Sequence, residues 1–512
     1  MEVVILHYHL NHGGVTSVIE NHLNSLATLS SDQQPSRVTV VCGGRFDAWN
    51  AQLAEDLPFT CEMAVVEALE YDHFRTGDSS LLAALAKLLQ AFDRDSTVLH
   101  IHNHSLGKNA QMTDVVSQLA ALGWKILLQL HDFAEDLRPA NYQHLVQKAN
   151  SIDQLQAKLY PQAEQIHYAV LNGRDRKFLQ TAGIPNQRLE LLPNPVLPFT
   201  NPPNVAQVQQ ARSELFDVLK IPTGHRLVLY PVRPIRRKNL GELLLWSLLV
   251  ENTTFMMTMA PLNPQEQTSY RRWVEFAQAN QLPVEFEVAK RVDLPFEQVY
   301  AAADAILTTS IAEGFGMVYL EASLAQRPLV GRKLPDICSD FELAGTKFPG
   351  LATDLKIPTA QVDLMAIKQS HRRWLEQLCA DYGLPLAIAD EQSSVLFSGN
   401  VMDYARSESG QQRDFLQRVK TEAKLRATLR ELNPHLQAIV SDEAIWHETH
   451  EHNGRVIAEN YSPAVIGKQL MSMYESMLLS HPSQVLHDPG IAQSILQNFV
   501  APQMLYPIRI ES

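Results

Sequence analysis

Short apolar runs alternate with amphipathic stretches along the first two hundred residues. The runs are rich in Val, Ile and Leu, which predicts strands, and the stretches between them carry apolar residues at helical spacing. Strands that alternate with helices indicate a mostly parallel sheet covered on both faces. The predicted strands are Val3–Leu10, Arg37–Cys42, Val98–His102, Lys125–Leu130, Ile166–Leu171 and Arg188–Leu192, and the helices include Val15–Leu29, Ser80–Phe92 and Ala110–Leu122.

A second alternating region follows a proline-rich segment. Pro193–Pro203 contains five prolines and predicts a linker. Strands are then predicted at Arg226–Val232, Thr254–Met259, Val284–Val288, Ala305–Thr309 and Pro328–Val330. We therefore predict an α/β fold with two Rossmann-like, doubly wound parallel-sheet domains that face a cleft.

The pattern changes after about Leu343. Residues 345–458 show helical spacing, as in Met365–Tyr382 and Gln411–Leu432, and little strand character. We predict a largely helical insertion there, of unknown role. Ala464–Leu479 predicts an amphipathic helix, and residues 480–512 predict a proline-punctuated tail.

Composition narrows the class of protein. A chain of 512 residues exceeds the roughly 250–300 residues at which single cores stop growing, so at least two domains are expected. A net charge of −13 argues against nucleic acid as a partner. No apolar run approaches the ~20 residues of a membrane span, and Met1–His7 lacks the basic start of a signal peptide. The four cysteines show no metal or disulfide spacing, so we expect a reduced, cytoplasmic protein without an integral membrane segment.

The segment Glu313–Glu321 is the most informative motif. It follows the apolar run Ala305–Ser310 and predicts a strand, a glycine turn and a helix that opens at Gly316 or Met317. Free N–H groups at a helix start suit a phosphate, and glycines let the main chain approach it closely. Glu313 and Glu321 would repel the phosphate itself, but they suit hydroxyl groups on either side of it. Taken alone, they could also be one capping and one surface glutamate.

A basic cluster precedes this motif. Arg233 follows the strand predicted at Arg226–Val232, and Lys238 stands near the start of the next helix. Strand ends face the ligand crevice of a doubly wound sheet, so both cations should point toward the Glu313 turn. Two cations would offset the charge of a diphosphate, although such a cluster alone also fits a solvated loop.

Two weaker signals lie in the first region. Gly13 and Gly14 form a strand-to-helix turn that permits close approach to a ligand, but such pairs are common. The G-x-G-x-x-G pattern of dinucleotide sites is absent here. His131 follows a predicted strand and could bond a substrate hydroxyl, or it could be a capping or partly buried histidine.

Metal and cofactor sites are not predicted. His100, His102 and His104 share one face of a strand, where a metal site is possible but a structural or acceptor-side role is favoured. The stretch His447–His452 fails the H-E-x-x-H pattern, because position 451 is Glu.

These motifs in this order resemble a known family. The glycine pair, the later histidine, an arginine followed five positions on by lysine, and two glutamates separated by seven residues all match its pattern. The chain resembles the retaining glycosyltransferases of the GT-B fold in glycosyltransferase family 4, which includes sucrose synthases, glycogen synthase-like enzymes and many bacterial sugar transferases. The resemblance covers roughly residues 1–343 and returns near Tyr461–Leu478, where the family has a helix that crosses back onto the first domain. It implies a domain 1–200 completed by a helix 460–479, a domain 201–459 that includes the insertion 345–458, and a tail 480–512.

The resemblance implies a role for each matched residue. Arg233 and Lys238 would bind the diphosphate of a UDP-, GDP- or ADP-linked sugar, Glu313 the donor sugar and Glu321 the ribose. The remaining donor-binding residues would be Gly13, Gly14, Gly314, Phe315, Gly316, Met317 and Val318. His131 would contact the transferred sugar, and together with Glu313, Arg233 and Lys238 it forms the predicted catalytic set. The reaction implied is sugar transfer with retention to a small-molecule or glycan acceptor, without metal or other cofactor.

The chain departs from the family at several positions. Val232 and Asn239 replace the glycines before the arginine and after the lysine, and the insertion replaces an expected glycine–leucine–valine segment. Other functions therefore stay open. A phosphorylase or an epimerase on a similar scaffold is one, and a catalytically silent sugar-nucleotide sensor or partner subunit is another.

Overall fold

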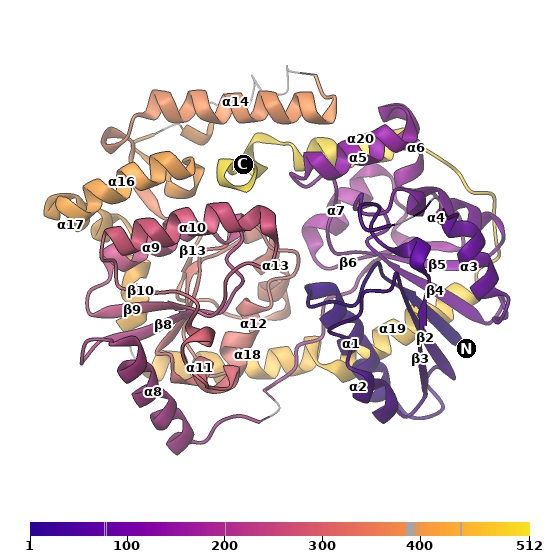
Figure 1. Ribbon diagram of the computed structural model, residues 1–512, viewed down its shortest axis with the longest axis horizontal. Helices are drawn as coiled ribbons and strands as arrows, with labels where there is room; N and C mark the ends of the chain where they lie inside the picture. The colour runs from indigo at the N-terminus through magenta and orange to yellow at the C-terminus, as the bar shows by residue number, and fades with distance from the viewer. Residues whose placement is uncertain are drawn as a thin grey trace. The chain divides into compact units, whose positions relative to one another are not determined.

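The protein divides into two compact units. The computed structural model describes residues 1–75, 77, 79–199, 201–385, 395–397, 399–440 and 443–511, so parts of the predicted linker, insertion and tail lie outside the described residues. The first unit comprises 1–196, 378–384 and 459–501, and the second comprises 197–377, 385–458 and 502–512. Figure 1 labels the elements of each unit.

The first unit is built on a parallel sheet. Within the described residues its strand order is β3-β2-β1-β4-β5-β6-β7. The strands are β1 (Glu2–Leu6), β2 (Arg37–Cys42), β3 (Thr60–Val65), β4 (Thr97–His102), β5 (Lys125–Leu130), β6 (Ile166–Val170) and β7 (Leu189–Leu191). The central strands β4 and β5 are buried throughout, which explains their near-continuous apolar runs. β3 was not predicted, because it is a partly exposed edge strand with polar residues.

Helices cover both faces of this sheet. They are α1 (Gly14–Ala27), α2 (Ala51–Asp56), α3 (Leu81–Leu89), α4 (Gln111–Ala121), α5 (Pro139–Ala149), α6 (Ile152–Leu159), α7 (Gly173–Ala182), α19 (Pro463–Leu478) and α20 (Pro489–Phe499). α19 packs along α1, and Leu470, Tyr474 and Met477 enter the core beside Val3 and Ile5. The predicted tail from 480 contains α20, which contacts α6 and α7, while residues 502–512 count with the second unit.

The second unit has its own parallel sheet. Among the residues described, the order is β10-β9-β8-β11-β12-β13. The strands are β8 (Arg226–Tyr230), β9 (Thr253–Met257), β10 (Val284–Glu285), β11 (Ala305–Thr308), β12 (Leu329–Arg332) and β13 (Leu351–Ala352), and the helices among them are α8 (Val205–Leu219), α9 (Leu240–Leu249), α10 (Pro264–Ala279), α11 (Phe296–Ala302), α12 (Val318–Leu324) and α13 (Pro335–Ala344). α9 is buried on nearly every side, which fits its uninterrupted leucines.

The predicted helical insertion packs onto this second core. Its elements are α14 (Leu364–Tyr382), α16 (Ser409–Thr421), α17 (Ala423–Leu432), α18 (Glu443–Tyr461) and the antiparallel pair β14 (Lys356–Pro358) and β15 (Val401–Asp403). α16 and α17 lie against α9, and Phe415 and Leu416 share its apolar cluster with Trp246 (Figure 1). The buried Arg332 of β12 joins Glu242 on α9 at 2.5 Å to Asp403 on β15 at 2.7 Å. Most of the insertion is therefore part of the second unit, whereas residues 378–384, at the end of α14, count with the first unit.

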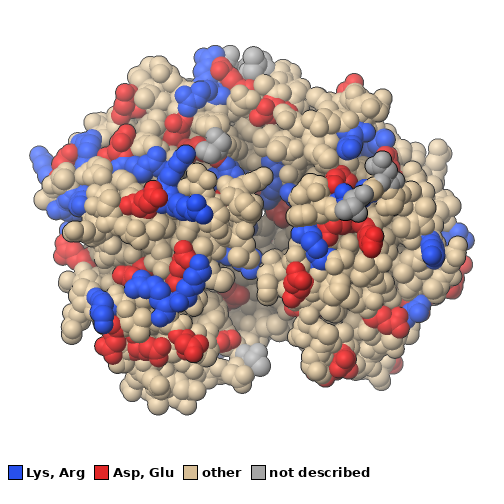
Figure 2. All heavy atoms as spheres, viewed as in Figure 1, with Lys and Arg blue, Asp and Glu red and all other residues tan. Residues whose placement is uncertain are grey.

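Charges of both signs are interspersed over the visible face of each unit (Figure 2). Of the helices in the described part of the chain, none combines the length and the hydropathy needed to cross a bilayer.

Candidate functional site

The strand order of the second sheet locates its ligand-binding edge. β8 is followed outward by β9 and β10, whereas β11 is followed by β12 and β13, so the order reverses between β8 and β11. Open α/β sheets bind ligands at the carboxyl ends of strands beside such a reversal. Arg233 and Lys238 follow β8, and Glu313 follows β11.

Hydrogen bonds join the two loops that leave these strands. The Thr309 hydroxyl donates to the Lys238 carbonyl at 2.8 Å, and the Tyr230 hydroxyl donates to the same carbonyl at 3.1 Å. The N–H of Ile311 donates to the Arg237 carbonyl at 2.9 Å. Apart from the half-buried Arg237, these bonds join buried residues, where an unmade bond is costly, and they hold the basic loop against the glutamate turn.

The loops bring Lys238 and Glu313 into a buried ion pair. Each residue is only 8% exposed, and the Lys238 ammonium donates to Glu313 Oε1. Arg237, which the sequence did not single out, lies 3.7 Å from the other carboxylate oxygen. Burial alone would raise the pKa of Glu313, but Lys238 and Arg237 outweigh it and lower the pKa. Burial lowers the pKa of Lys238, and the nearby Glu313 opposes that shift.

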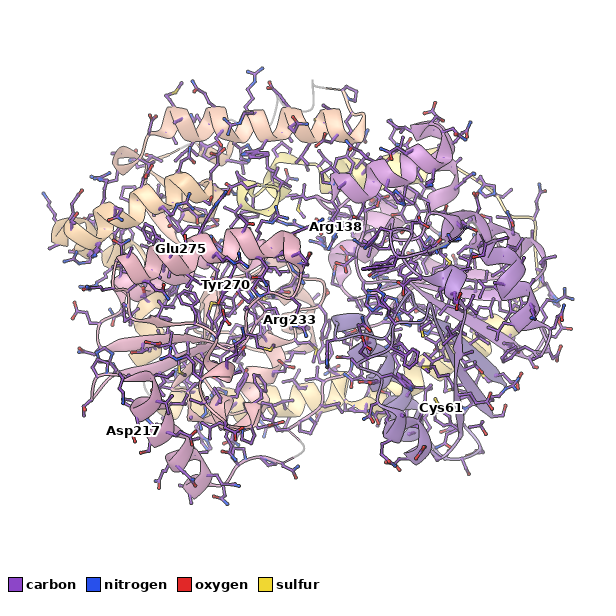
Figure 3. The ribbon with its side chains drawn as sticks, viewed as in Figure 1. Cys61, Arg138, Asp217, Arg233, Tyr270 and Glu275 are labelled. Carbon is purple, nitrogen blue, oxygen red and sulfur yellow. The ribbon has the colours of Figure 1, made fainter. Side chains whose placement is uncertain are left out.

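The other basic residues of this loop have different roles. Arg233 is partly exposed in the loop after β8, where Figure 3 labels it. Arg236 is held by Glu266 of α10, which also accepts the Arg236 N–H at 2.8 Å, and by the carbonyl of Glu511. Arg236 therefore supports the loop, while Arg233 and Lys238 are the predicted ligands of the diphosphate.

Asn239 explains one departure from the family pattern. It adopts a left-handed conformation with φ of 49°, which asparagine tolerates better than most residues. Its side-chain amide donates to Glu242 at 2.8 Å, the same glutamate that pairs with Arg332. Asparagine can therefore replace the expected glycine without losing the turn.

The glutamate turn needs glycine at one position. Gly316 has φ of +86°, and a Cβ there would collide with the ring of Tyr319. α12 begins at Val318, slightly later than predicted, and Met317 caps it without a side-chain hydrogen bond. Gly314 and the buried Phe315 precede this turn, and Phe315 packs on Phe341 with ring centroids 5.3 Å apart. Met317 and Val318 thus stand at the start of a helix whose first N–H groups receive no side-chain cap.

Glu321 carries a carboxylate with no charged partner among the described residues. It lies in the first turn of α12, and burial raises its pKa to about 7. The buried hydroxyl of Tyr300, which Glu321 influences electrostatically, also has no hydrogen-bond partner in the described structure. A partly buried carboxylate without a partner suits ligand hydroxyl groups, which can donate to it.

The first unit places Gly13, Gly14 and His131 at the equivalent edge of its sheet. There the strand order reverses between β1 and β4. Gly13 caps α1 in an extended conformation, and a Cβ on Gly14 would meet nothing within 4 Å. Packing within the protein therefore does not require glycine at position 14. His131 follows β5, and burial lowers its pKa to about 4, so it is neutral at physiological pH.

His131 belongs to a column of buried, stacked imidazoles. His102 Nδ1 lies 2.8 Å from His131 Nε2, and the stacked pairs His22–His100, His100–His102 and His102–His131 have ring centroids 5.9, 4.4 and 5.1 Å apart. His104 instead bonds the Leu159 carbonyl. His22 was missed from the sequence, because only the packing of α1 on the sheet brings it to His100 and His102.

The column offers three nitrogen ligands but not the geometry of a metal site. His22, His100 and His102 each have one nitrogen within 4.8 Å of the others. However, lone pairs lie in the ring planes, and His100 and His102 are tilted by only 21°, so their lone pairs do not converge. Both nitrogens of His100 are also engaged, with Tyr474 at 2.8 Å and Gln129 at 3.0 Å. The near-parallel rings and the engaged His100 favour a stacked group over a metal centre, and His22 and His102 Nε2 have no hydrogen-bond partner in the described structure.

Comparisons with known proteins support the fold and the class. No family model matches the chain. Mannosylglucosyl-3-phosphoglycerate synthase from Petrotoga mobilis is 26% identical over 347 residues, an alignment that spans 66% of this chain and 66% of the relative, just under two thirds of each. HepE from Anabaena, in complex with UDP and glucose, is 13% identical with a TM-score of 0.53. The superposition covers 93% of this chain and 100% of HepE. Sucrose-phosphate synthase from Thermosynechococcus elongatus has a TM-score of 0.50 at 15% identity, covering 93% of this chain and 98% of that one.

The chain has the GT-B fold. The predicted α/β class with two parallel-sheet domains and a helical C-terminal region is thereby confirmed. The name of the Petrotoga relative agrees with the predicted class of enzyme, a glycosyltransferase. The roles assigned to individual site residues stay predictions.

Proposed function

We propose that the protein is a retaining glycosyltransferase of family 4, which moves a sugar from a nucleotide-diphosphate donor to a small acceptor. One observation carries this proposal. At the strand-order reversal of the second sheet, the Lys238–Glu313 pair is held between two hydrogen-bonded loops, with Arg237 beside it and Glu321 on the adjoining helix.

The donor-binding roles follow from charge and position. We assign Arg233 and Lys238 to the diphosphate, because charge-assisted bonds to phosphate are worth about 1.5–3 kcal/mol each. The backbone from Gly314 to Val318 would hold the distal phosphate at the uncapped start of α12. Glu313 would accept a hydroxyl of the donor sugar, and Glu321 would accept the ribose hydroxyls. The predicted roles of Gly13, Gly14 and His131 remain part of the hypothesis.

The chemistry needs no protein nucleophile in this scheme. The cations stabilise negative charge as the diphosphate leaves, and the departing phosphate takes the acceptor proton on the same face of the sugar. The bond from the anomeric carbon to phosphate breaks while the bond to the acceptor oxygen forms, and the configuration is retained. No residue in this scheme must hold a metal ion.

The acceptor is proposed from the relative's name. The Petrotoga protein is named as the synthase of mannosylglucosyl-3-phosphoglycerate. We propose that the acceptor of this protein is likewise a small molecule with a negatively charged group. A catalytically silent sensor of sugar nucleotides is the alternative, and the similarity to a named synthase does not favour it.

A donor screen tests the function. Thermal unfolding is followed with UDP-, GDP- and ADP-sugars, and product is measured with 3-phosphoglycerate and with its glycosides as acceptors. We expect one nucleotide series to stabilise the protein and one acceptor to give a product with the donor's anomeric configuration by NMR. Inversion would refute the retaining mechanism, binding without turnover would favour the sensor, and no stabilisation by any donor would refute the proposal.

A further inference from the structure

Lys108 is a largely enclosed cation without a counter-ion in the described structure. It lies in the loop after β4, at the same edge of the first sheet as His131. Its ammonium is 3.5 Å from Asn141 Oδ1, at the limit of a hydrogen bond, and 5.5 Å from the ring centroid of Tyr71. No described carboxylate oxygen lies within the 4.0 Å of an ion pair. Desolvating a cation that has no charged partner is costly, so a residue of this kind suits an anionic ligand.

The nearby carboxylates do not supply that anion, since each is paired with another cation. The pairs are Glu70 with Arg45 at 2.5 Å, Asp72 with Arg75 at 3.2 Å, and Asp132 and Asp136 with Arg138. Asp72 also contacts His144 at 2.8 Å. Burial and then Arg138 lower the pKa of Lys108, although Asp132 opposes the shift. Arg138 serves two of these four carboxylates, so the four carboxylates balance the three arginines and Lys108, and Lys108 is the cation of this group without a carboxylate at ion-pair distance among the described residues.

A phenol and an imidazole lie near this cation. The Asn11 N–H donates to His9 Nδ1 at 3.3 Å, so the neutral imidazole carries its proton on Nε2 and donates it to the Tyr71 hydroxyl at 3.0 Å. The Tyr71 ring contacts both Lys108 and Arg45, with centroid distances of 5.5 and 5.1 Å. Burial raises the pKa of Tyr71 to about 12, so its hydroxyl keeps its proton. Burial and then Arg45 lower the pKa of His9, so its imidazole is neutral at physiological pH.

The topology places this group where ligands bind. His9 follows β1 and Lys108 follows β4, the two strands between which the order of the first sheet reverses, and Tyr71 follows β3. Loops from three strands therefore bring a lysine, a phenol and an imidazole to one edge of the sheet, at the position that open α/β folds use for ligands.

We infer that Lys108, Tyr71 and His9 form a subsite for the anionic group of the acceptor, a phosphate or a carboxylate. That the anion belongs to the acceptor rests on the proposed function. That an anion binds here is argued only from residues of the first unit. An ammonium offers three rotatable donors and a compact charge, which suit a phosphate oxygen. The Tyr71 hydroxyl adds a neutral hydrogen bond that helps to orient the anion.

Direct titration of the full chain tests this subsite. Binding of 3-phosphoglycerate, inorganic phosphate and glycerate is measured by calorimetry at fixed ionic strength, so that general screening is constant. We expect Lys108→Met to weaken 3-phosphoglycerate binding by roughly 10- to 100-fold, the loss of one or more charge-assisted bonds. Lys108→Arg should recover part of the affinity, and Tyr71→Phe should have a smaller effect. Lys87→Met, which removes an exposed lysine from α3, is the matched control and should bind like the wild type.

The outcomes separate this inference from the proposed function. UDP binding is measured in the same variants, and it should not change in Lys108→Met. Equal 3-phosphoglycerate affinity in Lys108→Met and wild type would overturn the subsite, as would the absence of wild-type binding to all three anions. Anion binding that depends on Lys108 in a protein that binds no sugar nucleotide would uphold the subsite and refute the donor proposal. Phosphate binding without glycerate binding would show that the subsite binds the phosphate group of 3-phosphoglycerate. Glycerate binding without phosphate binding would show that it binds the carboxylate.

Discussion

The two sheets present their ligand edges with different electrostatics. In the second unit, Lys238 and Glu313 neutralise each other, and Arg237 adds a further cation. In the first unit, the neutral His102 stacks on the neutral His131, and Lys108 has no carboxylate at ion-pair distance within the described part of the chain. Under the proposed function, the second unit's edge would bind a ligand with both diphosphate and hydroxyl groups, and the first unit's edge would bind a simple anion at Lys108.

Of the variants proposed, those that break the Lys238–Glu313 pair should lower the free energy of unfolding and the donor affinity the most. Lys238→Met leaves Glu313 buried beside Arg237 alone, and removing one partner of a buried pair costs about 3–5 kcal/mol. We expect a lower free energy of unfolding in urea and a loss of donor affinity. The double variant Lys238→Met/Glu313→Gln should regain much of the stability but none of the donor binding. Full recovery of donor binding in the double variant would show that the cation does not contact the diphosphate.

The glutamate turn should be nearly as sensitive to a single methyl group. Gly316→Ala places a Cβ against Tyr319 at a positive φ, and such strain costs about 1–3 kcal/mol. We expect lower stability and weaker donor binding by calorimetry. The matched control is Gly454→Ala in α18, where a Cβ would meet nothing within 4 Å and helix propensity predicts a gain of about 0.5–1 kcal/mol. Opposite signs in the two variants would support the turn geometry, and equal stability would contradict it.

Glu321 should give donor binding a dependence on pH. Burial raises its pKa to about 7, so below that pH the carboxyl is protonated and loses an acceptor for the ribose hydroxyls. Donor binding then requires loss of a proton, and affinity should fall by up to about tenfold per pH unit below 7 and level off above it. Glu321→Gln should bind more weakly at pH 8 and should lose this pH dependence. A wild-type affinity that is flat from pH 5.5 to 8 would mean that Glu321 does not contact the donor.

The donor edge was the easier region to predict from sequence. Arg233, Lys238, Glu313 and Glu321 lie in two short segments that directly follow strands, so local spacing and the strand–turn–helix pattern bring them together. Arg237 was missed because nothing in the sequence distinguishes it from its basic neighbours, and its place is fixed by contacts with the distant Ile311, Ala312 and Glu313.

Fewer of the site residues of the first unit could be predicted from the sequence. His9, Tyr71 and Lys108 are far apart in the sequence, and they come to the same side of the sheet because each follows the carboxyl end of a parallel strand, β1, β3 or β4. His22 is an unremarkable residue of an amphipathic helix until α1 packs on β4. The sequence of the insertion also did not predict that Phe415 joins the apolar cluster of the second unit or that Asp403 pairs with the buried Arg332, because long-range packing leaves no local pattern.

Hydrogen–deuterium exchange with and without the stabilising nucleotide tests the central claim most directly. The account predicts that bound nucleotide slows exchange in residues 231–241 and 309–322, the two loops that meet at the carboxyl ends of β8 and β11. Slower exchange elsewhere with no change in these two segments would contradict it.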